Sequence, residues 1–372
     1  MVRRPPGTVR LLGLVAALAV GCSPQTPSAS PEVTRTPTSP PVSAPAPTAT
    51  PTAGPTAEPS PSPAGVAPLD GLPADPALAN RLPVAVMIDD NVIARPQSGF
   101  NAASIVYQAP ADGGEDRYML VFQEMDAPDI GPVRSGRPYF VYWAAEYRSA
   151  FAHYGGDEKT LKKVIPPIAN KLIYNLDALF GSGSAFHRIS TRNAPHNAYT
   201  STASLYQTAA AKRYPTEMIG GLTNRLFADD APAADRPAKG SITIPYGRGA
   251  AGYTYDRASN SYLRSVAGKP HIDPVDNKQV VARNVVVLFM ALSIDPESER
   301  GYSRPALAQI GKGTAWVFRD GLIIKGTWKK ADQGGLTQFF DAAGKEISLV
   351  RGRTFIQVVA IGTKVTYEAG VG

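Results

Sequence analysis

The sequence predicts an α+β protein in which a mixed α/β segment is followed by a mainly antiparallel β segment. Strand-like and helix-like stretches alternate over residues 80–222 without a regular βαβ rhythm, whereas residues 240–372 contain mostly strand-like stretches. A Pro-rich segment precedes both, and 372 residues suffice for two domains and a tail. We therefore predict two domains at these positions, with residues 222–240, rich in Ala, Asp and Pro, as the linker between them.

The first predicted domain contains short apolar runs separated by turn-forming residues and two longer helical stretches. The predicted strands cover residues 83–88, 104–108, 118–123 and 150–153, and the predicted helices cover residues 138–148 and 201–212.

The second predicted domain begins with a nearly continuous apolar run at 284–292, which predicts a strand buried on both faces. Asp320-Gly321 separates the strand-like runs 314–319 and 322–328 and predicts a tight hairpin. We expect further strands around Phe339 and at 355–359 to continue this antiparallel meander.

The first 22 residues have the pattern of a bacterial export signal. A basic segment, 1–10, precedes an apolar run, 11–20, which is too short to span a bilayer core of about 30 Å. Residues 18–22, Leu-Ala-Val-Gly-Cys, resemble a lipobox, although leucine stands one place earlier than usual. The sequence therefore predicts cleavage before Cys22, lipidation of its sulfur and extracytoplasmic attachment to the membrane. The alternative is an ordinary cleaved signal with an incidental cysteine.

Residues 23–68 predict a disordered tether. Fourteen prolines lie here among Ser, Thr and Ala, and Glu32, Arg35 and Glu58 are the only charged residues. Such a composition cannot form a core and favours an extended spacer.

Charge and cysteine content exclude several classes of protein. The formal net charge of +7 includes three arginines of the export signal, so the remaining chain carries 35 basic and 31 acidic residues. This mild excess does not indicate a nucleic-acid partner. Since Cys22 is the only cysteine, a thiol catalyst, a thiolate metal site and an intrachain disulfide are excluded beyond it.

The densest polar cluster is residues 130–139. Ser135 is a candidate N-cap for the helix that follows, and Arg134 and Arg137 flank that point. A helix N-terminus with two guanidinium groups predicts an anion site. The alternative is that the arginines pair with Glu115 or Asp116 and only fasten the loop.

Two further loops carry candidate binding residues. The loop from His187 onward includes Arg192, His196 and Asn197, and the loop after the fourth predicted strand includes His153 and Asp157. The alternatives are a hydrogen-bonded structural loop, with Asn197 or Thr200 capping the next helix, and a histidine satisfied within the core.

No complete catalytic or metal-binding signature is present. The histidines lack the close spacing of a metal site, no G-x-S-x-G elbow surrounds Ser135, and adjacent acids such as Asp89 and Asp90 are usually solvated. Residues 311–313, Gly-Lys-Gly, lack a P-loop context and predict a turn. We expect neither a metal nor a cofactor.

Several motifs resemble those of the YerB-like family, lipoproteins with a DUF3048 domain. The resemblance covers about residues 82–359, and one departure is Phe355, where tryptophan is expected. It implies an α+β fold of two domains and an extracytoplasmic, membrane-attached location, and it implies no established activity. The motifs that carry it are Arg95–Gly99, Ala103–Tyr107, Ile130–Tyr139, Arg192–Asn197, Gly311–Gly313, Gly326–Trp328 and Arg351–Thr354.

Our leading hypothesis is a non-catalytic envelope module that binds an anionic or glycan ligand, such as a wall polymer, or a partner protein. The alternatives are a hydrolase or transferase of envelope glycans that uses His196 or His153, and a structural subunit of an envelope complex. Convergence of the loops 134–137, 153–157 and 192–197 on one cavity would favour binding or catalysis.

Overall fold

The computed structural model describes residues 65–220, 225–298 and 303–368, all within one compact unit. The predicted signal, Cys22 and the predicted tether up to residue 64 lie outside the described residues. Within these ranges, no helix is both long enough and apolar enough to cross a membrane.

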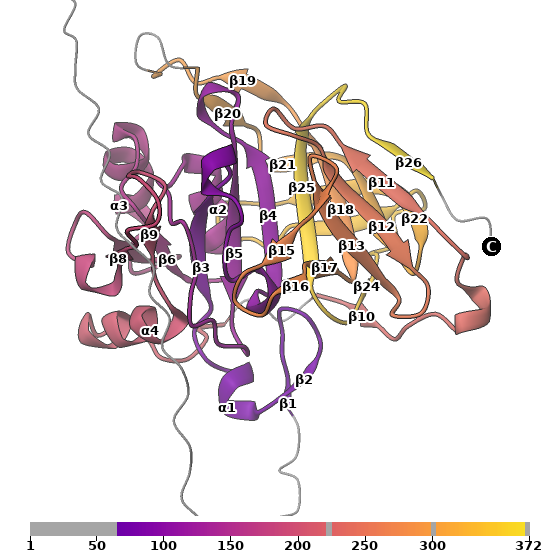
Figure 1. Cartoon of the computed structure of the whole chain (residues 1–372), viewed down its shortest axis with the longest axis horizontal. Coiled ribbons are helices and arrows are strands. Elements are labelled where there is room, and N and C mark those ends of the chain that lie inside the picture. Colours follow the sequence, from indigo (N-terminus) through magenta and orange to yellow (C-terminus); the bar gives the residue numbers. More distant parts are fainter. Residues whose placement is uncertain (1–64, 221–224, 299–302, 369–372) are drawn as a thin grey trace, which may run out of the picture. The chain divides into compact units, whose positions relative to one another are not determined.

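A ten-stranded mixed sheet forms the centre of this unit (Figure 1). Across the sheet the order is β23 (Gln338–Asp341), β22 (Leu322–Lys330), β21 (Gly311–Arg319), β18 (Asn284–Met290), β25 (Thr354–Ala360), β4 (Ile105–Pro110), β5 (Asp116–Phe122), β3 (Val84–Asp89), β6 (Ala150–His153) and β7 (Tyr174–Asp177).

Strand β25 joins the two predicted domains into one body. It pairs in parallel with β18 on one edge and with β4 on the other, so the sheet is continuous between them. The prediction that β25 continues an antiparallel meander is therefore wrong. Both β18 and β25 are buried along nearly their whole length, and such apolar strands need hydrogen-bonded partners on both edges.

A second, smaller sheet is antiparallel. Its order is β14 (Lys269–Pro270), β13 (Ser261–Val266), β12 (Ala251–Asp256), β11 (Ser241–Ile244) and β26 (Thr366–Glu368), and β17 (Val281–Ala282) also pairs with β13. Short antiparallel pairs join β1 (Gly65–Val66) to β2 (Pro73–Ala74), β8 (His187–Arg188) to β9 (Ala198–Tyr199), β15 (Ile272–Asp273) to β16 (Lys278–Gln279) and β19 (Leu292–Ile294) to β20 (Pro305–Leu307), and β10 (Phe227–Ala228) pairs in parallel with β24 (Leu349–Val350).

Helices are few and short. The α-helices are α1 (Pro76–Ala79), α2 (Pro138–Glu146), α3 (Ile165–Ile168) and α4 (Thr202–Ala211); 3₁₀ turns lie at Val92–Ala94, Phe100–Ala102, Asp112–Gly114, Gly183–Ala185 and Ala233–Asp235, and a π-helical turn at Lys159–Val164.

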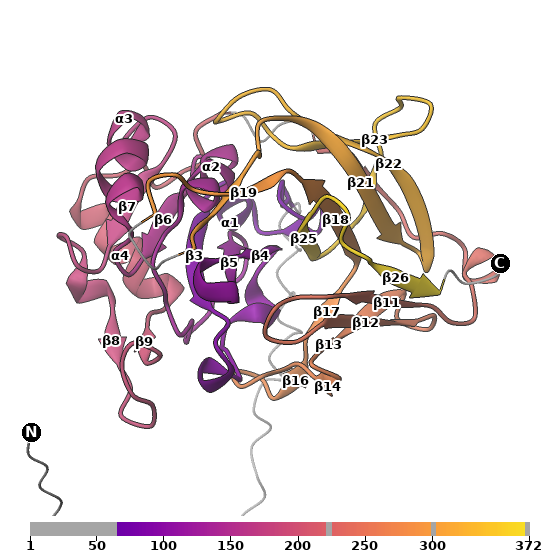
Figure 2. The same ribbon diagram turned by 90° about the horizontal axis from the view of Figure 1, so that it is seen from above.

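The central sheet separates two hydrophobic cores. Every residue of β3 is buried, and its alternate side chains enter different cores. Val86 packs in the core that contains Tyr253 of the small sheet, whereas Met87 packs in the core that contains Trp143 of α2. In Figure 2, α2 and the small sheet accordingly lie on opposite sides of the central strands.

Most predicted elements are present, with some corrections. The hairpin at Asp320-Gly321 is confirmed, and both residues adopt the positive φ that a tight turn with two such residues requires. Ser201, not Asn197 or Thr200, caps α4 through the amide of Ser204.

Two boundaries differ from the prediction. Order begins by β1, so the last residues of the predicted tether and those before residue 80 are structured. The described part of the predicted linker contributes β10 to a pair with β24.

The predicted turn at Gly311–Gly313 is instead the start of β21.

Candidate functional site

The loop before α2 is held rigidly against its neighbours. The amide of Arg134 donates to the carbonyl of Met87 (2.9 Å), and the carbonyl of Arg134 accepts from the amide of Tyr154 (3.0 Å). The amide of Gly136 donates to the carbonyl of Gly155 (2.9 Å). These bonds bring the predicted loops 134–137 and 153–157 side by side and fix where the arginine side chains begin.

Ser135 does not cap α2, so that prediction is wrong. Its hydroxyl donates to the carbonyl of Tyr154 (3.0 Å), and the N-cap position is occupied by Arg137, whose side chain makes no capping bond. The physical reason is that Pro138 starts the helix, which places Ser135 outside the first turn. The predicted anion site, in which Arg134 and Arg137 flank a helix N-terminus capped by Ser135, is therefore not formed in that way.

Arg137 is paired with an acid that the sequence analysis did not consider. Its guanidinium donates to both carboxylate oxygens of Asp112, with Nε 3.0 Å from Oδ1, and Nη1 lies 3.5 Å from Oδ2 of Asp157. Burial alone would raise the pKa of Asp112, but the hydrogen bonds and charge of Arg137, together with the charges of Arg117 and Arg304, lower it. The alternative of pairing therefore applies to Arg137, although its partners are not Glu115 or Asp116.

Arg134 is less fully engaged. Its Nε lies 3.2 Å from Oδ2 of Asp89, and that same oxygen lies 2.6 Å from Nδ1 of His196. No residue in the described ranges accepts a hydrogen bond from the terminal nitrogens of Arg134, and 22% of its side chain is exposed. Arg134 therefore shares its one acid with a histidine and keeps donors available.

Arg134 and Arg137 line a cavity of about 420 Å³, which we call the arginine cavity. Its lining contains five arginines and only two acids, so its formal charge is positive. The lining residues are Asp112, Gly113, Glu115, Arg117, Arg134, Ser135, Arg137, Arg248 and Arg304.

Three of these arginines were missed by the sequence analysis. Arg117 lies in β5, where burial and the charge of Arg137 lower its pKa to about 10, and its Nη1 donates to the carbonyl of Ser135 (2.9 Å). Arg248 reaches Glu115 at 3.8 Å, and Arg304 lies 3.9 Å from Asp112. Arg117, a charged residue inside the apolar run of β5, is the one local sequence signal for this site. Arg248 and Arg304 reach the cavity from distant loops, which local sequence does not reveal.

His153 and Asp157 do not line the arginine cavity. His153 is fully buried, with Nδ1 2.7 Å from the carbonyl of Gly155 and Nε2 2.8 Å from Oδ1 of Asn175. Asp157 accepts from the amide and hydroxyl of Thr160. These contacts hold the loop after β6 in place.

The loop with Arg192, His196 and Asn197 also remains outside the cavity lining. Arg192 donates to the carbonyls of Ala94 (2.6 Å) and Pro96 (2.8 Å), and Nδ2 of the Asn197 side chain donates to the carbonyl of Ile189 (3.0 Å). The His196–Asp89–Arg134 contacts connect this loop to the cavity. The three predicted loops therefore do not converge on one cavity.

Comparison with known proteins identifies the family. The model "Protein of unknown function (DUF3048) N-terminal domain" matches residues 69–215, and its C-terminal counterpart matches residues 242–356. The chain belongs to the DUF3048 family. It is 31% identical over 301 residues to "Putative lipoprotein YerB" of Bacillus subtilis (strain 168), covering 79% of this chain and 86% of that protein.

The fold is shared with a solved structure of this DUF3048 relative. The crystal structure of YerB from Bacillus subtilis matches with a TM-score of 0.71 and 27% identity, over 82% of this chain and 99% of that one. The suspected family is therefore confirmed.

Both DUF3048 segments contribute to the arginine cavity. Arg117, Arg134 and Arg137 lie in the N-terminal match, whereas Arg248 and Arg304 lie in the C-terminal match. The cavity therefore depends on the association of the two segments.

Proposed function

We propose that this protein is an envelope lipoprotein that binds an anionic polymer or glycan in the arginine cavity. The observation that carries the proposal is the lining of five arginines against two acids around about 420 Å³ of accessible space. That volume lies within the range of ordinary ligand pockets.

Phosphate and carboxylate groups fit this lining chemically. A guanidinium group is planar and presents paired donors that match two oxygens of such a group. Arg137 and Arg117 are held by the protein, whereas Arg134 and Arg248 retain exposed fractions of 22% and 46% of their side chains. We assign ligand contact to the latter two and support of the cavity wall to the former.

Binding is favoured over catalysis by the state of the histidines. His153 is enclosed with both ring nitrogens in hydrogen bonds, and His196 is paired with Asp89 outside the cavity lining. Ser135 lines the cavity, but its hydroxyl donates to a backbone carbonyl. Within the described part of the chain, neither Ser135 nor these two histidines form a nucleophile–base pair at the cavity.

The envelope location in the proposal rests on Cys22 and on the relative's name. Lipidation of Cys22 would attach the chain to the membrane, as the name of the YerB relative suggests for that protein. Anionic polymers that bear phosphate or carboxylate groups are ligands of matching charge in that compartment.

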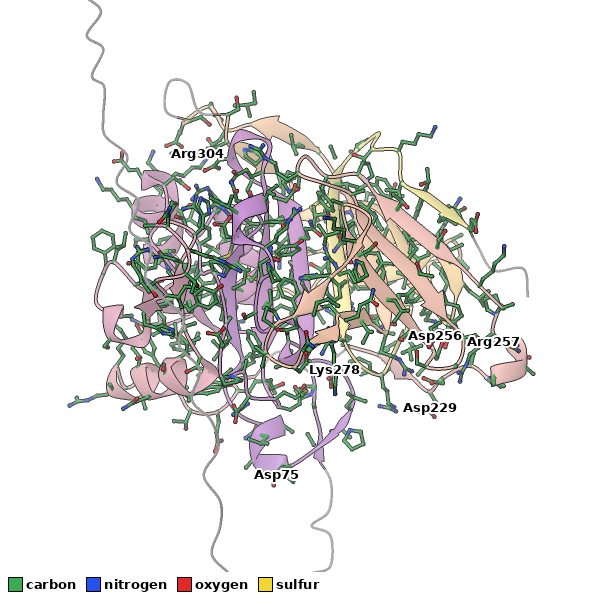
Figure 3. The ribbon with its side chains drawn as sticks, viewed as in Figure 1. Asp75, Asp229, Asp256, Arg257, Lys278 and Arg304 are labelled. Atoms are coloured by element: carbon green, nitrogen blue, oxygen red, sulfur yellow. The ribbon has the colours of Figure 1, made fainter. Side chains whose placement is uncertain are left out.

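Calorimetry on the full-length chain tests the proposal, with poly(glycerol phosphate) as the anionic probe and dextran as the neutral one. We expect binding of the anionic probe only, weakened roughly tenfold or more in Arg134→Gln/Arg248→Gln because two charge-assisted contacts are lost. The matched control is Arg257→Gln, an exposed arginine that Figure 3 places far from Arg304. Equal affinity of all three proteins for the anionic probe would contradict the proposal.

A further inference from the structure

A second cavity lies where the two DUF3048 segments meet on another part of the surface. Its volume is about 510 Å³, and its walls combine the turn at Val92–Ala94 and the residues after it with the end of β13, β14 and the start of β15. The apolar part of the lining consists of Val92, Pro96, Val266, Ala267, Pro270 and Ile272. None of these residues lines the arginine cavity.

Exposed apolar side chains mark the rim of this cavity. Val92, which lines the cavity, is 58% exposed, and it lies in a turn that caps itself through Asn91; the next residue in that turn, Ile93, is 61% exposed. Large apolar side chains displayed together beside a cavity are typical of ligand or partner contacts. The apolar part of a ligand could therefore pack against this surface.

His271 supplies a polar group with an unused donor. It lines the cavity and is only 5% exposed. Its Nδ1 lies 2.7 Å from Nη1 of Arg264, and because a guanidinium can only donate, Nδ1 must accept. The proton of the neutral ring therefore resides on Nε2, which has no hydrogen-bond partner in the described residues.

Burial and the positive charges around His271 keep its ring neutral, and those charges favour an anion in the cavity. Burial and the nearby Arg264 and Arg95 lower the pKa of His271 well below its ordinary value. Lys269, which also lines the cavity, is exposed and has no ion pair within the described ranges. Arg95 is paired with Asp90, so Lys269 is the cation that remains for a ligand.

A buried donor without a partner destabilises the fold because its lost hydration is not replaced, and an acceptor on a ligand would supply the missing hydrogen bond. We propose that this cavity binds a monocarboxylate with an apolar chain, of the fatty-acid class. Its carboxylate accepts a hydrogen bond from Nε2 of His271 and pairs with Lys269, and its chain covers the wall formed by Val92, Pro96 and Ile272. This site is independent of the arginine cavity and of the ligand proposed there.

The test uses the full-length chain and decanoate, with acetate and decanol as probes that lack the chain or the charge. Calorimetry should detect decanoate binding, while acetate and decanol should bind at least about tenfold more weakly. Addition of decanoate should shift the Nε2–H signal of His271, which can be assigned by mutation because the chain has 4 histidines. Equal binding of decanol, or an unmoved His271 signal, would overturn the proposal.

Two exposed substitutions locate the site without disturbing the core. Lys269→Gln should weaken decanoate binding about fivefold by removing an exposed charge, and Val92→Asp should weaken it about tenfold or more. Lys278→Gln on β16, labelled in Figure 3, is the matched control because it is exposed and outside the lining. If decanoate does not bind, or if neither substitution weakens it, the assignment is wrong.

Discussion

Two arginine centres join the same two segments of the chain, and they differ in how fully their donors are used. Arg264 is fully buried between the two sheets. Its guanidinium donates to Gln108 Oε1 (2.7 Å), His271 Nδ1 (2.7 Å), Tyr118 (3.1 Å) and Tyr253 (3.2 Å). Although burial alone would lower the pKa of Arg264, Tyr118 and Tyr253 hold it above its ordinary value. Arg264 therefore uses four of its five N–H donors within the fold, and none of its surface is exposed to a ligand.

The arginine cavity has the opposite balance. Arg134 shares one carboxylate with His196, and Arg117 has a lowered pKa because burial and other guanidinium groups destabilise its charge. The same residue type, at the same kind of junction, stabilises the fold where its donors are satisfied. Where several guanidinium groups line a cavity, their mutual repulsion destabilises the fold, and a bound anion would relieve that repulsion.

The largest expected effect is on the satisfied centre. Arg264→Met leaves His271 Nδ1, Gln108 Oε1 and two tyrosine hydroxyls without their donor, so we expect a loss of about 5 kcal/mol in the free energy of unfolding. Urea denaturation of the full chain measures it. The control Arg257→Gln should change stability by less than about 0.5 kcal/mol. A loss below about 1 kcal/mol in Arg264→Met would contradict the structural role assigned to Arg264.

A buried ion pair provides a second satisfied junction. Lys330 Nζ lies 3.0 Å from Glu146 Oε1, both side chains are fully buried, and Thr337 also donates to this carboxylate. Lys330→Met should lower the free energy of unfolding by about 3 kcal/mol, because it leaves the buried carboxylate of Glu146 without its cation. The double variant with Glu146→Leu should recover part of that loss, as measured by the same denaturation. A double variant less stable than Lys330→Met would show that the charge is not the cause.

A buried acid near the arginine cavity should make stability depend on pH. Burial and the charge of Asp90 raise the pKa of Asp116 from 3.8 to about 8. Because the folded state holds this proton more tightly than the unfolded state, stability is greatest below pH 4 for this group and falls as the pH rises towards 8. The slope from one group is at most about 1.4 kcal/mol per pH unit. In Asp116→Asn that slope should disappear from urea titrations between pH 4 and 8, and an unchanged slope would assign it to another group.

The smallest expected effect on stability is at the cavity itself. Arg134→Gln removes one incompletely used ion pair, so we expect the free energy of unfolding to change by less than about 1 kcal/mol. Thermal or urea unfolding at neutral pH gives the value. A loss as large as that of Arg264→Met would place Arg134 among the structural arginines and contradict its assignment to ligand contact.

Local patterns in the sequence predict much of the fold and little of its assembly. The apolar run of β3 and the Asp320-Gly321 turn determine a strand and a hairpin through neighbouring residues. The position of β25 between β18 and β4 depends on pairing between distant segments. An apolar run that is buried on both faces does not indicate which distant strands it pairs with, so the sequence could not place β25 between β18 and β4.

The candidate site was predictable to a similar extent. The density of arginines in residues 130–139 identified Arg134 and Arg137, because both lie in one loop. Arg248 and Arg304 reach the cavity through the folding of the C-terminal segment, which local sequence does not reveal. Ser135 was wrongly predicted as an N-cap because its partner is a backbone carbonyl, which the sequence does not reveal. His153 matches the alternative of a histidine satisfied within the core.

The most direct measurement is the response of the arginine Nε–H signals of the full-length chain, followed by nuclear magnetic resonance, to poly(glycerol phosphate). The signals of Arg134 and Arg248, assigned through their glutamine variants, should shift on binding, while that of Arg264 should stay in place. Signals of Arg134 and Arg248 that do not move when the polymer is added would contradict the account, as would a shift of Arg264 as large as theirs.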